Sequence, residues 1–379
     1  VWRLTLDARG SLTSADVLRA VVRSRSRLDY AGMQALADAN PDPEPERSPG
    51  DLARWLDTAG IDGPAAQAVL LRAVGRRRIE LERSRGGAGL PMPEQEVEET
   101  DEGYRVRLRP ALAAEDWNAQ LSLTTGMAAA AIMLRGGVGL LRTLPEPDHA
   151  VVDRFRRQAD ALGVPWLEHL PYGEFLRGLD LTDPARLALV HEAGALFRGA
   201  AYTPFDGTEP AVRVHAAVAA PYAHVTAPLR RLVDRFGLAC CHALSQGLEV
   251  PEWVREALPA LPAAMRASDR LAGELERRCL DQVEAAVLAG SVGRDFDAVV
   301  VEVRRGGESG QVQVIGPPVL AGCDGPLRLG EPVRVRLTDA DPDTGRVRFA
   351  AAPPREPGRG PGGYPGPADE PDGRPRRAG

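Results

Sequence analysis

The sequence has 379 residues, of which 44% are hydrophobic and 26% are charged, and its formal net charge is −6. A chain of this length can bury one large core and a smaller second one, at about 100–200 residues per domain. All 47 basic residues are arginines, yet the acidic balance argues against a protein that coats nucleic acid non-specifically. A local channel of arginines remains compatible with this charge, which by itself neither supports nor excludes RNA as a substrate.

The sequence also gives expectations about compartment and redox state. No apolar run reaches the roughly 18–20 residues that a membrane span needs, and the opening residues alternate in a way no signal peptide does. The cysteines lack Cys-x-x-Cys spacing, so neither a zinc knuckle nor a disulfide framework is expected. We therefore expect a cytoplasmic protein with no membrane contact and with reduced, mostly packed thiols. They are Cys240, Cys241, Cys279 and Cys323.

The N-terminal part predicts a hairpin followed by helices. Residues 1–14 alternate with period two around a turn at 7–10. Residues 29–39 have helical spacing, and the three prolines of residues 40–45 end that helix in a surface loop. Residues 51–78 are again helical, with a break near the glycines at 60 and 63.

The middle of the chain is expected to be mostly helical. Residues 94–102 read as an acidic loop that leads into an alternating strand at 104–109. A largely helical pattern then runs from 116 to about 288. Within it, Asp183 followed by a proline starts one helix, and Pro251 starts another.

The C-terminal part changes character after residue 290. Short strands are predicted at 296–303, 311–315, 332–337 and 346–350, which suits a small barrel of the OB type. Residues 353–379 are dominated by Pro, Gly, Arg and acidic residues, and are expected to be a disordered tail. The predicted division is 1–290, 291–352 and 353–379.

The segment from Tyr222 to Asp234 carries the clearest chemical signal. Pro228 suits the first position of a helix, which would place Arg230 and Arg231 in the first turn beside free amides and the positive end of the helix dipole. Each guanidinium can hold two non-bridging phosphate oxygens, so the pattern predicts a phosphodiester site. An i,i+4 pair with Asp234 is expected to orient Arg230.

This segment closely resembles the RNB exoribonuclease family, whose hallmark runs Tyr-x-His-Phe-Thr-Ser-Pro-Ile-Arg-Arg-Tyr-x-Asp. The matching positions are Tyr222, His224, Thr226, Pro228, Arg230, Arg231 and Asp234, with Tyr202 and His215 matching an upstream element. Three further stretches are similar to family segments, at residues 26–30, 140–145 and 267–270. The resemblance covers roughly residues 1–290.

The resemblance implies an α+β fold, in which an RNB domain with a mixed sheet packed against helices precedes an OB-type RNA-binding barrel. It implies a monomeric 3′-to-5′ exoribonuclease that hydrolyses single-stranded RNA with two magnesium ions and releases nucleoside 5′-monophosphates. It assigns catalytic roles to Arg230, at the scissile phosphate, and to Asp269, near the leaving nucleotide. The RNA-binding residues it implies are Tyr30, Arg142, Tyr222, His224, Thr226 and Arg231.

Departures from the family pattern keep an alternative open. The family's metal-binding aspartate cluster lies upstream of the strand with which this chain opens, so no metal ligands are assigned here. Ala227 and Leu232 replace a serine and a tyrosine of the hallmark, and residues 124–128 lack the usual asparagine. The alternative is a catalytically inactive RNA-binding or regulatory protein with an RNB fold, and a third hypothesis is an unrelated enzyme whose arginine motif is coincidental.

Several of these residues also have a purely structural interpretation. Tyr30 also fits a core position on a helix face, and His224 a packing or capping role. The arginines between 72 and 85 form the densest basic run, which is either a solvated helix face or a contact with RNA. Four arginines of the barrel are expected on one face of a hairpin by period-two geometry. They are Arg334, Arg336, Arg346 and Arg348.

Overall fold

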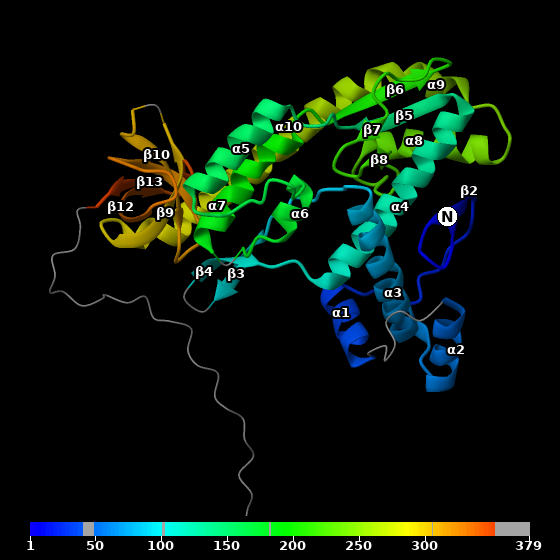
Figure 1. Ribbon diagram of the computed structural model, residues 1–379, viewed down its shortest axis with the longest axis horizontal. Helices are drawn as coiled ribbons and strands as arrows, with labels where there is room; N and C mark the ends of the chain where they lie inside the picture. Colours follow the sequence, from blue (N-terminus) through cyan, green and yellow to red (C-terminus); the bar gives the residue numbers. More distant parts are fainter. Residues whose placement is uncertain (41–48, 101–102, 182, 305, 353–379) are drawn as a thin grey trace, which may run out of the picture.

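The computed structural model describes residues 1–40, 49–100, 103–181, 183–304 and 306–352. A helical body that carries four two-stranded sheets occupies most of the molecule, and a closed five-stranded barrel stands at one end (Figure 1). The mixture of helices and strands and the terminal barrel confirm the predicted α+β fold class. No helix in the described part of the chain is both long enough and apolar enough to span a membrane.

The chain opens with the predicted hairpin. Strand β1 (Trp2–Leu6) pairs antiparallel with β2 (Leu12–Val17), and the carboxylate of Asp7 accepts the amides of Arg9 and Ser11 to close the turn. Residues 18–29 then lead to α1 (Tyr30–Ala39), whose N-cap residue Asp29 accepts the Gly32 amide at 2.7 Å. Most of the predicted proline loop at 40–45 lies outside the described residues.

Two long helices form the frame of the N-terminal half. The predicted helical stretch is divided into α2 (Pro49–Ala59) and α3 (Gly63–Ser84), and α3 crosses α4 (Ala113–Gly136). At the crossing, a Cβ atom on Gly75 would lie 2.4 Å from Cβ of Trp117 and 2.7 Å from its Cα. The absence of a side chain at position 75 is therefore what lets the two helices approach so closely.

The expectation of an acidic loop at residues 94–102 was wrong. Residues 94–100 form β3 (Glu94–Thr100), which pairs antiparallel with β4 (Gly103–Arg109). The reason is cross-strand charge pairing, because each glutamate on one face of β3 lies opposite an arginine of β4. The pairs are Glu94 with Arg109 at 2.6 Å, Glu96 with Arg107 at 2.9 Å and Glu98 with Arg105 at 3.0 Å.

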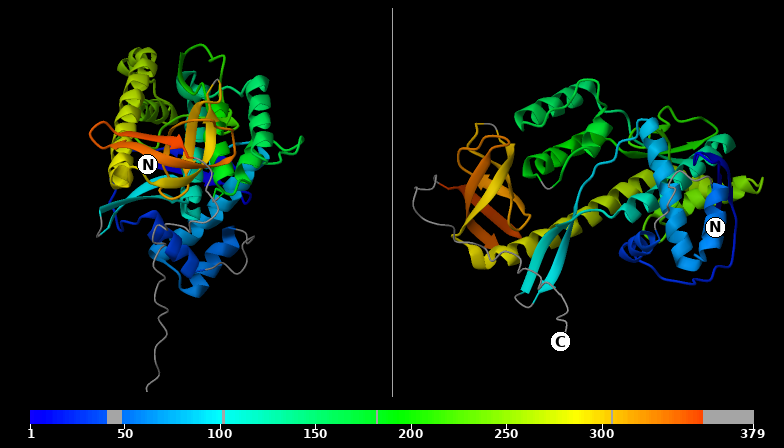
Figure 2. Two further views of the ribbon diagram at one scale, coloured as in Figure 1. Left: turned by 90° about the vertical axis from the view of Figure 1, so that its left-hand side faces the viewer. Right: turned by 60° about the horizontal axis from the view of Figure 1, so that its bottom comes forward.

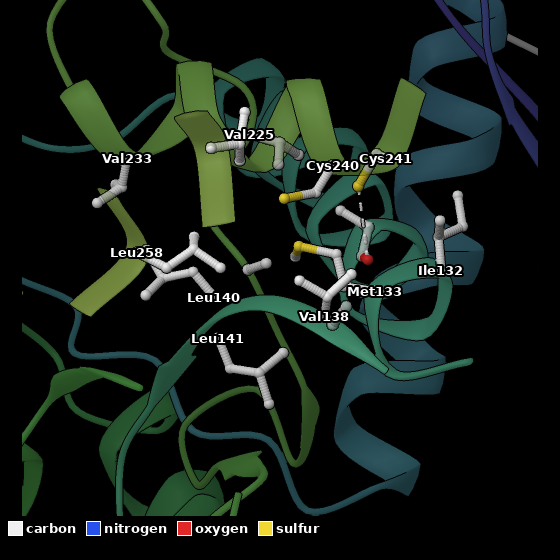
Figure 3. Packing of buried hydrophobic residues seen from close by; sticks show 14 of the residues in the cluster. Ile132, Met133, Val138, Leu140, Leu141, Val225, Val233, Cys240, Cys241 and Leu258 are labelled. Atoms are coloured by element: carbon white, nitrogen blue, oxygen red, sulfur yellow. Dashed lines mark hydrogen bonds between the residues drawn. The ribbon is translucent and has the colours of Figure 1, made fainter. Parts of the chain in front are cut away.

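The main core lies between α4 and the elements that follow it (Figure 3). Strand β5 (Val138–Thr143) pairs antiparallel with β6 (Ala201–Asp206), and α8 (Leu232–Ser245), α9 (Glu252–Ala257) and α10 (Leu261–Leu288) pack around them. The cysteines are free thiols, and all except Cys279 are buried, as expected. Burial raises the pKa of Cys240 to about 12, so this thiol is a packing group rather than a nucleophile.

A second cluster joins α5 (His149–Ala161), α6 (Tyr172–Arg177) and α7 (Pro184–Ala193). Its centre is aromatic, with the rings of Trp166 and Phe175 stacked at 4.5 Å and Phe155 packed edge-on against both. Helix α7 begins as predicted, because the side chain of Asp183 accepts the Ala185 amide at 2.9 Å. Likewise, Pro251 is the N-cap of α9.

The barrel is built from five strands whose order closes on itself as β10-β11-β13-β12-β9. The bounds are Asp295–Val303 for β9, Ser309–Val314 for β10, Leu320–Asp324 for β11, Pro332–Asp341 for β12 and Arg346–Ala351 for β13. The sequence pattern missed β11. Helix α10 runs the length of the body to the barrel, and its last residue, Leu288, packs in the barrel core (Figure 2).

The crossing of α3 and α4 gives a first prediction. We expect Gly75→Ala to lower the free energy of unfolding by about 1–3 kcal/mol, because the new methyl group would overlap the backbone and Cβ of Trp117. The matched control is Gly273→Ala in α10, where nothing lies within 4 Å of the added Cβ. That change should stabilise the protein by about 0.5–1 kcal/mol through helix propensity. Urea unfolding measures the free energy of unfolding of both variants. Equal changes in the two would contradict the close approach of α3 and α4 at Gly75.

Candidate nucleic-acid interface

The helix expected to begin at Pro228 begins four residues later, at Leu232, with Arg231 as its N-cap residue. Residues 226–231, called here the arginine turn, fold before the helix. The Ala227 carbonyl accepts the backbone amides of Arg230 at 3.2 Å and of Arg231 at 3.0 Å. The expectation that Arg230 and Arg231 lie in a first helical turn with free amides was therefore wrong, since these two amides close the turn instead.

The arginine turn is anchored by one buried carboxylate. Asp234 is 0% exposed and accepts the Ala227 amide at 2.6 Å. Its two oxygens also accept Nε of Arg231 at 2.9 Å and Nη2 at 2.8 Å. The prediction that Asp234 pairs with Arg230 was wrong. Residue 230 precedes the helix, so the i,i+4 relation does not apply to it. Asp234 instead fixes Arg231 in a bidentate pair.

Arg230 is the exposed cation of this turn. Its side chain has no hydrogen-bond or ion-pair partner among the residues that the structure describes, and the neighbouring Leu229 is 103% exposed. Thr226 is also exposed, and its hydroxyl accepts Nη2 of Arg231 at 3.5 Å. The turn thus presents one arginine held in place and one whose five N–H donors are free for an anion.

A neutral aromatic cluster lies behind the turn. The Tyr202 hydroxyl and Nδ1 of His224 are 2.8 Å apart, and the His224 ring meets Tyr202 and Tyr222 edge-on. Burial, followed by the charge of Arg231, lowers the pKa of His224 to about 3. Burial, followed by the charge of Arg142, lowers the pKa of His215 to about 4. Both imidazoles are therefore uncharged at neutral pH, and the positive charge of the site belongs to arginines.

Two further predicted residues reach this cluster from other elements. Arg142 on β5 stacks its guanidinium over the Tyr202 ring at 4.6 Å, and its backbone amide donates to the Tyr222 carbonyl at 2.8 Å. Asp269 is exposed on α10, close enough for its charge to contribute to the raised pKa of Tyr202, whose main cause is burial. The structure therefore gathers Arg142, Asp269 and the arginine turn around Tyr202.

Tyr222 and Tyr30 occupy different settings. Tyr222 is only 8% exposed and packs on α4 at Gly126, where a Cβ would lie 2.1 Å from the tyrosine ring. Tyr30 is 45% exposed at the start of α1, and its hydroxyl accepts Nδ2 of Asn118 at 3.0 Å. Asn118 lies eight residues before Gly126, about 12 Å along α4. Tyr30 is thus a surface aromatic at a distance from the arginine turn.

Sequence reasoning did not include Tyr202 among the site residues, although its match to the upstream family element was the available signal. In the basic run, the structure gives two arginines a structural role. Arg78 is buried and donates to the Gly10 carbonyl at 3.0 Å, and burial lowers its pKa. Arg72 is also buried and donates to the Asn40 carbonyl at 2.8 Å. In the barrel, Asp295 pairs with Arg334 and Arg336, and Asp339 with Arg346.

The carboxylates of the site do not suit a metal centre. Across the described ranges, no group of three or more His, Cys, Asp or Glu side chains could hold a metal ion. At the arginine turn itself, both oxygens of Asp234 are already used by Arg231 and by a backbone amide. The residues present therefore do not fit a pair of magnesium ions.

Comparison with known proteins identifies the class of this chain. Residues 1–243 match the RNB domain, and residues 294–352 match the RNase II-type exonuclease C-terminal S1 domain. The RNB match covers more than half of the sequence, so the chain belongs to the RNB family. No curated protein matches it.

Solved structures give particular relatives of the same fold. The apo form of Mycoplasma genitalium RNase R superposes with a TM-score of 0.73 at 13% identity, and its complex with ribose-methylated single-stranded RNA with 0.72 at 12%. Both alignments cover 92% of this chain but 57% of the RNase R chain. Yeast Ssd1, described as a pseudonuclease, has a TM-score of 0.57 at 15% identity, covering 88% of this chain and 40% of its own.

The buried pair gives a second prediction. We expect Asp234→Asn to lower the free energy of unfolding by about 3 kcal/mol, because it leaves the Arg231 guanidinium without its buried counter-charge. The control is Asp16→Asn, whose partner Arg3 is largely exposed, and which should cost less than about 1 kcal/mol. Chemical unfolding measures both changes, and a cost at Asp234 no larger than at Asp16 would refute the anchoring role.

The neutral histidines give a third prediction. An unfolded histidine titrates near pH 6.5, above the folded pKa of about 3 for His224, so the unfolded chain takes up the proton first as pH falls. The contribution of His224 to stability is thus fully present above about pH 6.5 and is lost progressively as pH falls toward 3. We expect His224→Asn to reduce the loss of stability between pH 7 and pH 5, measured by urea unfolding at each pH. If the free energy of unfolding changes with pH in the same way for the wild type and His224→Asn, this role of His224 is contradicted.

Proposed function

We propose that this protein is a 3′-to-5′ hydrolytic exoribonuclease that acts on single-stranded RNA, and that its arginine turn grips the phosphodiester backbone. The observation that carries the proposal is the pairing of a fixed cation with a free one. Arg231 is held by the buried Asp234, and Arg230 beside it is exposed and unpartnered within the described structure. This arrangement gives a preorganised receptor for a phosphate group.

The other residues near the turn have proposed roles that follow from their positions. Arg230 takes non-bridging oxygens of the scissile phosphate, and Arg231 and Arg142 add positive charge along the backbone. Thr226 is exposed and offers a hydroxyl to the same strand. His224, being neutral, contributes a hydrogen bond rather than a charge. Its ring lies between those of Tyr202 and Tyr222, which position it.

Two residues would act on the nucleotides themselves. Tyr30 is 45% exposed, which suits stacking of its ring on a base. Asp269 is exposed on α10, where its charge contributes to the raised pKa of Tyr202, and we assign it to the leaving nucleotide. The division into an RNB part at 1–290, an RNA-binding barrel at 291–352 and a tail at 353–379 belongs to the same proposal.

Hydrolysis by this family calls for divalent metal, for which we propose magnesium. The described residues do not provide the ligands, so no catalytic step is assigned to them beyond holding and orienting the RNA. The products we propose are nucleoside 5′-monophosphates.

A second candidate function is RNA binding without hydrolysis. It is favoured by the similarity in fold to yeast Ssd1, which is described as a pseudonuclease. In this case the arginine turn binds the RNA backbone, and no nucleotide is released.

One assay separates the two functions and tests the site. The full-length protein is incubated with 3′-labelled oligo(A) and magnesium, while binding is measured in parallel by fluorescence anisotropy. Labelled monophosphate supports the exoribonuclease, whereas binding without release supports the second candidate.

The fourth prediction concerns Arg230. We expect Arg230→Gln to weaken binding about ten- to a hundredfold, because a hydrogen bond to a charged group contributes about 1.5–3 kcal/mol. The control, Arg154→Gln on the exposed face of α5, should leave binding unchanged. If Arg230→Gln binds RNA as tightly as the wild type, the arginine turn is excluded as the phosphate site. The remaining hypothesis is then an unrelated function with a coincidental arginine motif.

A further inference from the structure

The segment between β2 and α1 is unusually open. Every residue from 18 to 29 is exposed, and the segment has neither helix nor strand structure. Val21 and Val22 are 104% and 74% exposed, so even the apolar side chains face solvent. The segment runs along the outside of the helical body before it reaches α1 (Figure 2, right).

Its charge sets this segment apart from an acidic protein. It holds four arginines, and no acidic residue occurs between Asp16 and Asp29. Across the part of the chain that the structure describes, none of the four has a hydrogen-bond or ion-pair partner. In β3 and β4, by contrast, each arginine is matched by a glutamate. The four residues are Arg19, Arg23, Arg25 and Arg27.

The spacing of these arginines has a structural consequence. Arg23, Arg25 and Arg27 alternate with small serines, so if the segment extends along a bound strand, their side chains point to the same side about 6–7 Å apart. This repeat is comparable with the separation of successive phosphates along an extended single strand of RNA. A folded protein partner would need a matching row of carboxylates, whereas a nucleic acid presents such a row of negative charges along its own backbone.

The segment also ends at the surface aromatic residue. Two residues after Arg27, Asp29 caps α1, and this cap fixes the start of the helix at Tyr30. The Tyr30 hydroxyl accepts a hydrogen bond from Asn118, and Tyr30 is exposed three residues after the last arginine. A row of cations that leads to an aromatic ring is the usual composition of a surface that tracks single strands without reading sequence.

We propose that Arg23, Arg25 and Arg27 form a rail that holds the phosphate backbone of single-stranded RNA and delivers it to Tyr30. The inference rests on the proposed function and extends it, because it gives the RNA a second contact surface outside the arginine turn. The rail recognises the backbone alone, so it acts equally on oligo(A) and oligo(U).

The fifth prediction tests the rail through salt dependence. Binding of fluorescent oligo(A) and oligo(U) to the 379-residue chain is measured by anisotropy at several salt concentrations without magnesium. The slope of log affinity against log salt is negative, and each lost phosphate contact reduces its magnitude by about 0.7 for a single strand. We therefore expect Arg23→Gln/Arg25→Gln to reduce the magnitude of the slope by about 1.4 for both oligonucleotides.

The control is Arg154→Gln/Arg157→Gln on α5, which removes the same charge from two exposed arginines elsewhere on the surface. Its slope should equal that of the wild type. Because residues 23 and 25 are exposed, we expect both double variants to fold like the wild type.

Three results would overturn the rail. In the first, Arg23→Gln/Arg25→Gln keeps the wild-type slope while Arg230→Gln still weakens binding. The proposed function is then supported and the rail is excluded, and the segment would instead be a surface for a protein partner. If both double variants reduce the magnitude of the slope equally, the change reflects the net charge of the protein, and the rail is again excluded. If the wild type binds neither oligonucleotide, the proposed function and the rail fail together.

Discussion

The buried carboxylate of Asp234 is the constraint on which the site depends. It is fully enclosed, so its charge is tolerable only because the Ala227 amide and the Arg231 guanidinium saturate its oxygens. The same contacts fix the path of the chain before α8 and hold the largely buried guanidinium of Arg231 in place. Arg230, one residue earlier, is exposed to solvent. One aspartate thus converts a flexible arginine pair into a preorganised site.

The surroundings of this turn keep the positive charge on arginine alone. Burial lowers the pKa values of His215 and His224 far enough that both rings are neutral at physiological pH. The Arg142 guanidinium lies over the Tyr202 ring, where the π face compensates part of its lost hydration. The result is a small area where cations meet neutral aromatic groups, which suits a polyanion carrying bases. The proposed rail at residues 23–27 would add further cations on an open segment that precedes Tyr30.

Much of the fold could be predicted from the sequence, because its signals are local. The hairpin turn, the Asp183 cap and the period-two strands of the barrel each depend on neighbouring residues. Strand β3 could not be predicted in this way, because its glutamates are stabilised by arginines on another strand. The late start of α8 was missed for a similar reason, since Asp234 accepts the amide of Ala227, seven residues earlier. Spacing placed Arg230 and Arg231 in the site, but which arginine Asp234 holds is decided by three-dimensional geometry.

The central claim is that Arg230 contacts one particular phosphate of bound RNA. A double-mutant cycle tests this directly, by combining Arg230→Gln with oligo(A) molecules in which a single phosphodiester is replaced by an uncharged methylphosphonate. The account predicts a coupling free energy of about 1 kcal/mol or more at one linkage and near zero at the others. Additive effects at every linkage would contradict it, because Arg230 would then act only through the net charge of the protein.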